Sequence, residues 1–244
     1  MKNIKLLNDS KKGFSLIECL ISLSLFLIIV LACLEFLGRT RTLFVKLKDK
    51  EEAREGVLAA LDKIRTDLQQ GGSGLIFPTQ LGLLEGISED NGILIILSRE
   101  KELSLSSDLV EGQTRIQLES TSQLKKRREV CFFDSLNGEI KTISWVDKGS
   151  VVISSPLEYP HFREKTSAIL LRTVSVFLDE KKQVLRRKVN SSPAQPLLEE
   201  VGSFSFNLDK TTNLVRLRLA LETNMEKFYE ISVFPKNTAL ANSR

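Results

Sequence analysis

The chain has 244 residues, of which 42% are hydrophobic and 27% are charged. This balance excludes an intrinsically disordered chain and a protein with many membrane spans. The formal net charge of +4 is small. Much of it lies in residues 1–13, which contain four lysines and one aspartate. Without this segment, the charge gives little reason to expect an acidic partner such as nucleic acid.

The cysteines and the histidine restrict covalent and metal chemistry. Cys19 and Cys33 fall within an apolar run, so Cys131 is the only thiol in the polar remainder, where it has no partner for an intramolecular disulfide. We expect Cys131 to be a buried strand residue. His161 is the only histidine and no Cys-x-x-Cys occurs, which argues against a zinc site. We expect His161 to lie on the surface, and we expect no cofactor and no small-molecule substrate.

Residues 14–37 form a continuous apolar run, FSLIECLISLSLFLIIVLACLEFL, without proline or glycine. As a helix, these residues would be about 36 Å long at about 1.5 Å per residue, which exceeds the hydrocarbon core of about 30 Å. The run therefore predicts one transmembrane helix. Basic residues flank it on both sides, so flanking charge alone does not orient it.

Glu18 is the unusual residue of this run, because an unpaired carboxylate within a membrane costs up to about 2.5–3.5 kcal/mol. The sequence KKGFSLI precedes it at residues 11–17. Together these residues resemble the processing motif of type IV prepilins and type II secretion pseudopilins. The resemblance implies that a prepilin peptidase cuts between Gly13 and Phe14 and methylates the new amine of Phe14.

The chemistry of these residues is consistent with that motif. Gly13 has no side chain to obstruct a peptidase that must approach the backbone closely. The amine of a mature Phe14 would be charged, and within a bundle of helices it could pair with Glu18 of a neighbouring subunit. The lysines would keep the leader in the cytoplasm. The alternative for Glu18 is an interfacial carboxylate that reaches the headgroups.

Two other N-terminal signals compete with the prepilin motif. An ordinary signal peptide needs a shorter apolar core followed by small residues in an A-x-A-like pattern, and this sequence lacks both features. A lipoprotein signal is suggested by Val-Leu-Ala-Cys at residues 30–33. Leu31 fits that pattern poorly, and Glu18 would interrupt its apolar region. A membrane-anchored or lipoprotein-type binding module outside the cytoplasm is therefore the alternative class.

Helical periodicity continues beyond the apolar run. Six apolar residues recur at a three-four spacing, interrupted by Lys50 and Arg54. They are Leu43, Leu47, Val57, Leu61, Ile64 and Leu68. We expect one helix over residues 14–70, a C-cap at the glycine-rich residues 71–74 and then a linker. The stripe is suited to packing against a sheet; the alternative is a coiled-coil spacer over residues 43–68.

The remainder of the chain has the short apolar runs and turn signals of β-strands. Expected strands lie at 93–97, 129–133, 140–146, 151–153, 204–208, 215–221 and 229–233, with a hairpin formed by 168–178 and 184–189. Clean alternation over residues 215–221 predicts a sheet with one wetted face. The predicted fold class is α+β: a long N-terminal helix packed on a mainly antiparallel sheet.

Motifs for catalysis or nucleotide binding are absent from the sequence: there is no GxGxxG, P-loop or EF-hand pattern. Two basic runs, at 125–128 and 186–188, lack interleaved aromatic residues. We expect both to be solvated surfaces, not nucleic-acid sites, and we expect no enzymatic activity.

The order of features in the second half resembles the larger minor pilins of the W kind and pseudopilins of the J kind. A hairpin with LRRKV leads through a proline-containing loop to PLLEEV, SFSFNLD, LVRLRLALE and a last strand ending in FPKN. The resemblance implies a leader at 1–13, an assembly helix at 14–70 that crosses the cytoplasmic membrane at 14–37, and an external head at 71–244. It also implies a subunit that helps to prime or cap a type IV pilus or a secretion pseudopilus, with other minor and major pilins or pseudopilins as partners.

Overall fold

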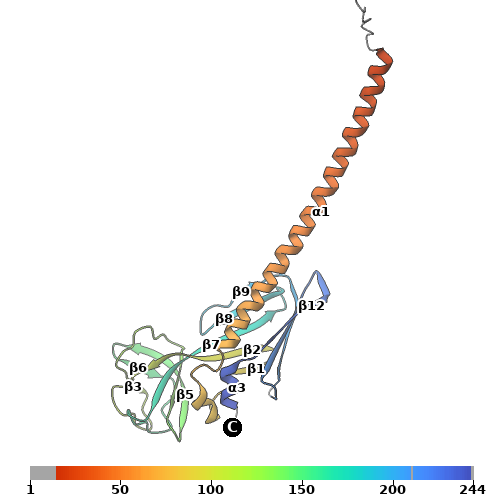
Figure 1. Ribbon diagram of the computed structural model, residues 1–244. Coiled ribbons are helices and arrows are strands. Elements are labelled where there is room, and N and C mark those ends of the chain that lie inside the picture. The colour runs from red at the N-terminus through yellow and green to blue at the C-terminus, as the bar shows by residue number, and fades with distance from the viewer. Residues whose placement is uncertain (1–14, 210, 243–244) are drawn as a thin grey trace, which may run out of the picture. The chain divides into compact units, whose positions relative to one another are not determined.

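The computed structural model describes residues 15–209 and 211–242 of the chain. These residues form one long helix, a β-rich region and two short helices (Figure 1). The elements in chain order are α1 (Leu16–Gln70), α2 (Ile76–Gln80), β1 (Ile87–Asp90), β2 (Ile93–Leu103), β3 (Arg115–Gln117), β4 (Glu129–Phe133), β5 (Gly138–Asp147), β6 (Ser150–Ile153), β7 (Ser167–Asp179), β8 (Val184–Val189), β9 (Gln195–Leu198), β10 (Val201–Asp209), β11 (Leu214–Leu221), β12 (Asn224–Val233) and α3 (Lys236–Asn242). This order confirms the predicted α+β class.

Helix α1 is 55 residues long and is the one helix among the described residues that is long and apolar enough to cross a membrane. The chain divides into two compact units, Met1–Glu55 and Gly56–Arg244. The first unit contains most of α1. The second unit, which we call the head unit, contains the last turns of α1 and all of the strands.

The end of α1 is fixed by glycines and by α3. Asn237 donates a hydrogen bond from Nδ2 to the carbonyl of Gln69 at 3.3 Å, so α3 satisfies one of the carbonyls left free at a helix end. Gly72 has a φ of +74°, a conformation that favours glycine, and its N–H donates to the carbonyl of Leu97 at 2.8 Å. The predicted end of the helix at the glycine-rich residues 71–74 is therefore confirmed, and this segment is also bonded to β2.

The strands form two sheets. The larger has nine strands in the order β1-β2-β7-β4-β5-β6-β3, with β8 also paired to β7 and β9 to β8. The smaller has three strands in the order β10-β11-β12. Every strand pair is antiparallel, as predicted. The expectation of a single sheet was wrong, because the last three strands pair only with each other.

Both sheets pack on the last turns of α1. The buried residues of α1 include Val57, Leu61, Ile64 and Leu68, each at most 2% exposed. They share one core with residues of β2 and β7 from the larger sheet and with Val215 and other residues from the smaller sheet. This confirms the predicted packing for the second part of the stripe and excludes a free coiled-coil spacer over residues 57–68, whereas Leu43 and Leu47 in the first part of the stripe are exposed. The last turns of α1 have an apolar face, which the sheets cover, and a polar face, which stays exposed.

A second core lies between β3, β4, β5 and β6 and the loops that connect them, including Ile116, Phe132 and Ile143. Cys131 on β4 is fully buried, as predicted, and burial raises the pKa of its thiol to about 12. The predicted hairpin is also present, since β7 pairs with β8 from Val174↔Val189 to Asp179↔Val184.

Candidate processing and assembly site

The predicted cleavage point between Gly13 and Phe14 lies outside the described residues. The described chain begins at Ser15, one residue before α1. Cleavage and methylation at this point therefore stay predictions from the sequence.

Glu18 lies in the first turn of α1, where it forms half of a capping box. The N–H of Ser15 donates a hydrogen bond to Oε2 of Glu18 at 2.9 Å. Ser15 occupies the N-cap position and Glu18 the third helical position, as in the S-x-x-E signature. The carboxylate thus satisfies a backbone donor that the helix cannot satisfy and lies at the positive end of the helix dipole. The sequence contains this signal, Ser15-Leu16-Ile17-Glu18, but the capping role of Glu18 was not predicted beside its assembly and interfacial roles.

The apolar part of α1 is not covered by protein. Every residue from 15 to 55 is exposed except Val30, which is half-buried. Large side chains such as Phe26 and Phe36 are more than 60% exposed. So large an apolar surface is not stable in water and marks a membrane or protein contact. This part of the helix is therefore suited to lie in hydrocarbon or to pack against other helices.

The last turns of α1 are joined to the larger sheet by buried ion pairs as well as by apolar packing. Asp67, 1% exposed, accepts hydrogen bonds from Arg187 on β8 at 2.6 and 2.9 Å and from Arg172 on β7 at 3.2 Å. Hydrogen bonding satisfies the carboxylate, which removes much of the cost of burying it. Arg172 also donates to Oε1 of Gln70 at 2.9 Å.

The two basic runs are therefore not simply solvated surfaces. Arg187 of the second run contacts Asp67, and Arg186 pairs with Asp179 at 2.9 Å. Arg128 of the first run is 7% exposed and donates to Glu100 and to the carbonyl of Leu171. Lys125, Lys126, Arg127 and Lys188 are exposed, as expected. The expectation was wrong for Arg128 and Arg187, because their carboxylate partners, Glu100 and Asp67, lie far away in sequence.

His161 was expected on the surface, but it is fully buried. Its Nε2 lies 3.0 Å from Oε1 of Glu139, a β5 carboxylate that also accepts from Lys141 at 2.8 Å and from the N–H of Glu158 at 2.9 Å. Burial alone would raise the pKa of Glu139, but the hydrogen bonds from Lys141, Glu158, His161 and Tyr159 hold it below its ordinary value. These side chains fasten a loop to β5 and are too inaccessible to act on a substrate.

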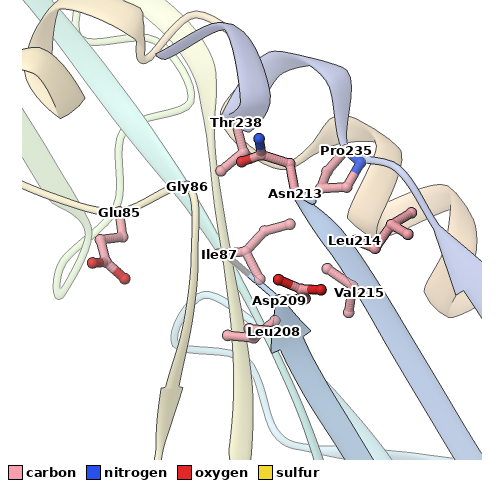
Figure 2. A pocket seen from close by; sticks show the side chains of 10 residues that line it. All are labelled: Glu85, Gly86, Ile87, Leu208, Asp209, Asn213, Leu214, Val215, Pro235 and Thr238. Atoms are coloured by element: carbon pink, nitrogen blue, oxygen red, sulfur yellow. The ribbon is translucent and has the colours of Figure 1, made fainter. Parts of the chain in front are cut away.

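The head unit also contains a cavity of about 250 Å³ near its C-terminal end. Figure 2 shows its lining: Glu85, Gly86, Ile87, Leu208, Asp209, Asn213, Leu214, Val215, Pro235 and Thr238. Asp209 accepts hydrogen bonds from the hydroxyl of Thr211 and from the backbone N–H groups of Thr211 and Thr212. Such bonds to its own turn hold the pKa of Asp209 far below its ordinary value. The described lining contains two carboxylates, Glu85 and Asp209, and no histidine, cysteine or lysine.

Metal-binding geometry is likewise missing from the described residues, in which no group of three His, Cys, Asp or Glu side chains could hold an ion. The candidate functional region is the N-terminal segment with α1.

Comparison with known proteins supports that choice. Residues 8–34 match the family model described as the prokaryotic N-terminal methylation motif. No protein of curated function matches the chain. A solved structure with limited similarity is the Gp54 tailspike of Acinetobacter baumannii bacteriophage AP22, in complex with A. baumannii capsular saccharide. It is 13% identical over 32% of this chain and 15% of the tailspike chain, with a TM-score of 0.28, too low to support an argument about fold or function.

The methylation motif supports a type IV pilin-like protein. It implies processing by prepilin peptidase and assembly with other pilins. The motif and the apolar helix that follows it are consistent with anchoring in the inner membrane.

Proposed function

We propose that this protein is a minor pilin or pseudopilin, a structural subunit that helps to prime or cap a type IV pilus or a type II secretion pseudopilus. One observation carries the proposal: a methylation motif at residues 8–34 overlaps the start of a 55-residue helix that ends within a β-rich head unit. The helix would supply assembly contacts and the head would be displayed outside the membrane. The subunit would act by packing, without a cofactor or a catalytic site.

The proposed organisation has three parts. Residues 1–13 form a leader on the cytoplasmic side, residues 14–70 form the assembly helix with its membrane span at 14–37, and residues 71–244 form the head. Prepilin peptidase cuts between Gly13 and Phe14 and methylates Phe14. Glu18 then pairs with the Phe14 amine of a neighbouring subunit in the low dielectric of the helix bundle.

The assignment to a minor subunit of the W or J kind rests on the head. Removing 13 of 244 residues leaves a mature chain of 231 residues, larger than is usual for a major pilin. Support also comes from the order of elements, in which a hairpin (β7 and β8) leads through β9 with Pro196 to the three strands of the smaller sheet.

Mass analysis of the N-terminus of membrane-extracted protein tests the proposal most directly. We expect a chain that begins with methylated Phe14. A lipidated Cys33 would instead indicate a lipoprotein, and an intact Met1 would indicate an uncleaved anchor. Either result would refute the proposal.

A Gly13→Leu variant sharpens this test. It should keep its leader, because a side chain at residue 13 blocks the approach of the peptidase. Gly38→Leu is the matched control, since a Cβ at Gly38 meets no atom within 4 Å. Normal maturation of the Gly13 variant would contradict the assigned cleavage point.

A further inference from the structure

The smaller sheet of the head unit has a long edge without a neighbouring strand. Strand β12 lies at one end of the order β10-β11-β12 and pairs only with β11. Every second residue of such an edge strand directs its N–H and C=O toward the place of a further strand. Among the described residues, no backbone group of β12 is bonded to an element other than β11. The ten residues of β12 therefore present a row of free donors and acceptors.

The other edge strands of the head unit are short or covered. In the larger sheet, β1 has four residues, β3 has three, and β9 has four and contains Pro196. Short edges and edge prolines prevent pairing with further strands. In the smaller sheet, β10 lies beside β7 and β8 of the larger sheet. Within the described part of the chain, β12 is thus the one long edge that is neither covered nor blocked by proline.

A groove lies beside this edge, between β12 and the last turns of α1. It has a volume of about 390 Å³, and we call it the edge groove. Its lining consists of Leu58, Ala59, Leu61, Asp62 and Arg65 of α1 and Ile231 of β12. A strand added to β12 would run about 4.8 Å from it, and its alternate side chains would point toward α1. These side chains would fill the edge groove and cover Leu58, which is 50% exposed.

The groove continues along α1 for the length of a short strand. A second hollow of about 390 Å³ is lined by Thr66, Gln69, Gln70, Phe234 and Lys236. Residues 58, 62, 65 and 69 of α1 line the two hollows at the three-four spacing of one helix side. From Leu58 to Gln69 the helix rises about 16 Å, which is the length of about five residues of extended chain. The space beside β12 therefore accommodates a short extended segment.

The opposite face of β12 shows which charges such a segment needs. Glu226, Phe228 and Glu230 alternate along the strand, so their side chains lie on one face. Phe228 is 57% exposed. Glu230 pairs with Arg218 at 2.9 Å but remains 41% exposed, and Glu226 has no basic partner among the described residues. Opposite charges directly across two strands stabilise their pairing. A complementary strand thus carries a basic, an apolar and a basic residue at alternate positions.

We infer that β12 and the edge groove bind an extended segment of another protein by strand addition. Two basic side chains of the segment lie opposite Glu226 and Glu230, with an apolar side chain opposite Phe228. Apolar side chains on its other face fill the edge groove. Main-chain hydrogen bonds supply the affinity, and the alternate side chains supply the specificity. The inference goes beyond the proposed function, because it concerns the head unit alone and does not depend on maturation at Phe14.

A second copy of this chain is a poor occupant of the same edge. Antiparallel pairing of two β12 strands that places Phe228 opposite Phe228 also places Glu226 opposite Glu230 twice. Like charges directly opposite each other destabilise a strand pair. The charge pattern therefore favours a different, basic segment. That pattern reads the same in both directions, so it fits a parallel or an antiparallel strand.

Binding of defined peptides to the full-length protein in detergent tests the inference. Fluorescence anisotropy compares labelled Thr-Lys-Val-Phe-Val-Lys-Thr with the same peptide in which glutamate replaces both lysines. We expect the lysine peptide to bind about ten-fold more tightly, because two cross-strand charge pairs change from attraction to repulsion. Glu226→Lys should lower the affinity for the lysine peptide about five-fold. Glu164→Lys is the matched control, since Glu164 is an exposed carboxylate outside both sheets, and it should leave the affinity unchanged.

Backbone methylation of the peptide distinguishes strand addition from other modes of binding. Two versions of the lysine peptide carry N-methyl groups, one on its odd-numbered residues and one on its even-numbered residues. An added strand bonds to β12 through only one of its two edges, where the N–H groups of alternate residues point. One version should therefore bind like the unmodified peptide, and the other should lose binding. Leu58→Ser should weaken the lysine peptide about five-fold, because it removes apolar contact from the edge groove.

Four results would overturn the inference. They are no binding of the lysine peptide up to about 1 mM, equal affinities for the lysine and glutamate peptides, equal effects of the two methylation patterns, and equal affinities of the Glu226→Lys and Glu164→Lys variants. A dimer of the full-length protein that the lysine peptide dissociates would identify the occupant as a second copy and would also refute it. A normal mature N-terminus together with any of these results leaves the proposed function intact. Peptide binding as expected by a protein that is not cut at Gly13 would instead refute only the proposed function.

Discussion

Helix α1 contains two stretches that differ in how their side chains are covered. Residues 16–55 have no buried side chain, whereas residues 57–68 have six: Val57, Ala60, Leu61, Ile64, Asp67 and Leu68. Both stretches are helical and both are rich in apolar residues. In the apolar run these residues surround the whole helix, and in the last turns they occupy one face.

The difference shows that the distribution of apolar residues around a helix, more than their number, indicates what covers it. An apolar face opposite a polar face is covered by the same chain, here by the two sheets. A helix that is apolar all round needs lipid or other helices. The predictions below test this comparison, from the largest expected effect to the smallest.

Leu61→Asp should cause the largest loss of stability. Leu61 is 2% exposed, so the substitution places an unpaired charge in the core and removes apolar contacts. In a fragment that begins at Arg39, we expect the free energy of unfolding to fall by about 3–5 kcal/mol. Urea denaturation followed by circular dichroism measures it.

Leu58→Asp is the control for this substitution, since Leu58 lies on the same turn of α1 but is 50% exposed. It should change the free energy of unfolding by less than about 0.5 kcal/mol. Equal unfolding curves for the two variants would mean that the last turns of α1 are not covered as described.

Asp67→Asn tests the buried charge of the same stretch. The amide keeps the shape of the carboxylate but leaves Arg172 and Arg187 without a counter-charge. Because these arginine side chains are 23% and 17% exposed, solvent screens part of the loss. We expect destabilisation by about 2–3 kcal/mol, less than for a fully buried pair.

Asp62→Asn provides the comparison for Asp67→Asn. The side chain of Asp62 is 70% exposed and pairs with Arg65 at 3.5 Å. Asp62→Asn should lower the free energy of unfolding by less than about 0.5 kcal/mol in the same denaturation experiment. If both variants have the same unfolding free energy, the contacts of Asp67 do not stabilise the packing of the last turns of α1 on the sheets.

Substitution of Glu139 tests whether a buried carboxylate away from α1 also stabilises the fold through its hydrogen bonds. Its pKa is lower in the folded state than in the unfolded chain, so its contribution to stability is present above the unfolded pKa, near 4.5, and is lost as the pH falls toward the folded pKa. Glu139→Gln should cost about 1–2 kcal/mol at pH 7. It should also flatten the dependence of stability on pH below about pH 5.

Urea titrations of wild type and Glu139→Gln between pH 3 and pH 7 measure both effects. Parallel pH dependences for the two proteins would show that Glu139 does not titrate with unfolding. Lys141 does not confuse this test, because its raised pKa affects stability only at pH values above its ordinary value of 10.5.

Much of the fold could be predicted from local sequence because its longer elements have strong periodicity. The strand at 129–133 and the hairpin that ends at 184–189 appear as expected. The missed strands are short or atypical: β3 has three residues and β9 contains Pro196, which suits only an edge strand.

Features set by distant contacts could not be predicted. His161 lies in a proline-containing segment that resembles an exposed loop, but it is buried because Glu139, 22 residues earlier, supplies its partner. The division into two sheets likewise depends on which strands pair and not on their pattern. At the candidate site, cleavage between Gly13 and Phe14 stays a prediction from the sequence, whereas the contact of Ser15 with Glu18 was established by the structure.

Glu18→Gln should have the smallest effect on the protein itself. The amide oxygen of glutamine can still accept the hydrogen bond from the N–H of Ser15, so the helix cap is kept while the charge is lost. Insertion into the membrane should be equal to or better than that of wild type, because a charge no longer has to enter hydrocarbon. Co-purification with sheared filaments should nevertheless fall if Glu18 pairs with the amine of a neighbour. Glu18→Ala removes both the cap and the charge and serves as the comparison. Wild-type recovery for the glutamine variant, with reduced recovery for the alanine variant, would show that Glu18 acts through the cap, and the proposed pairing with Phe14 would then be wrong.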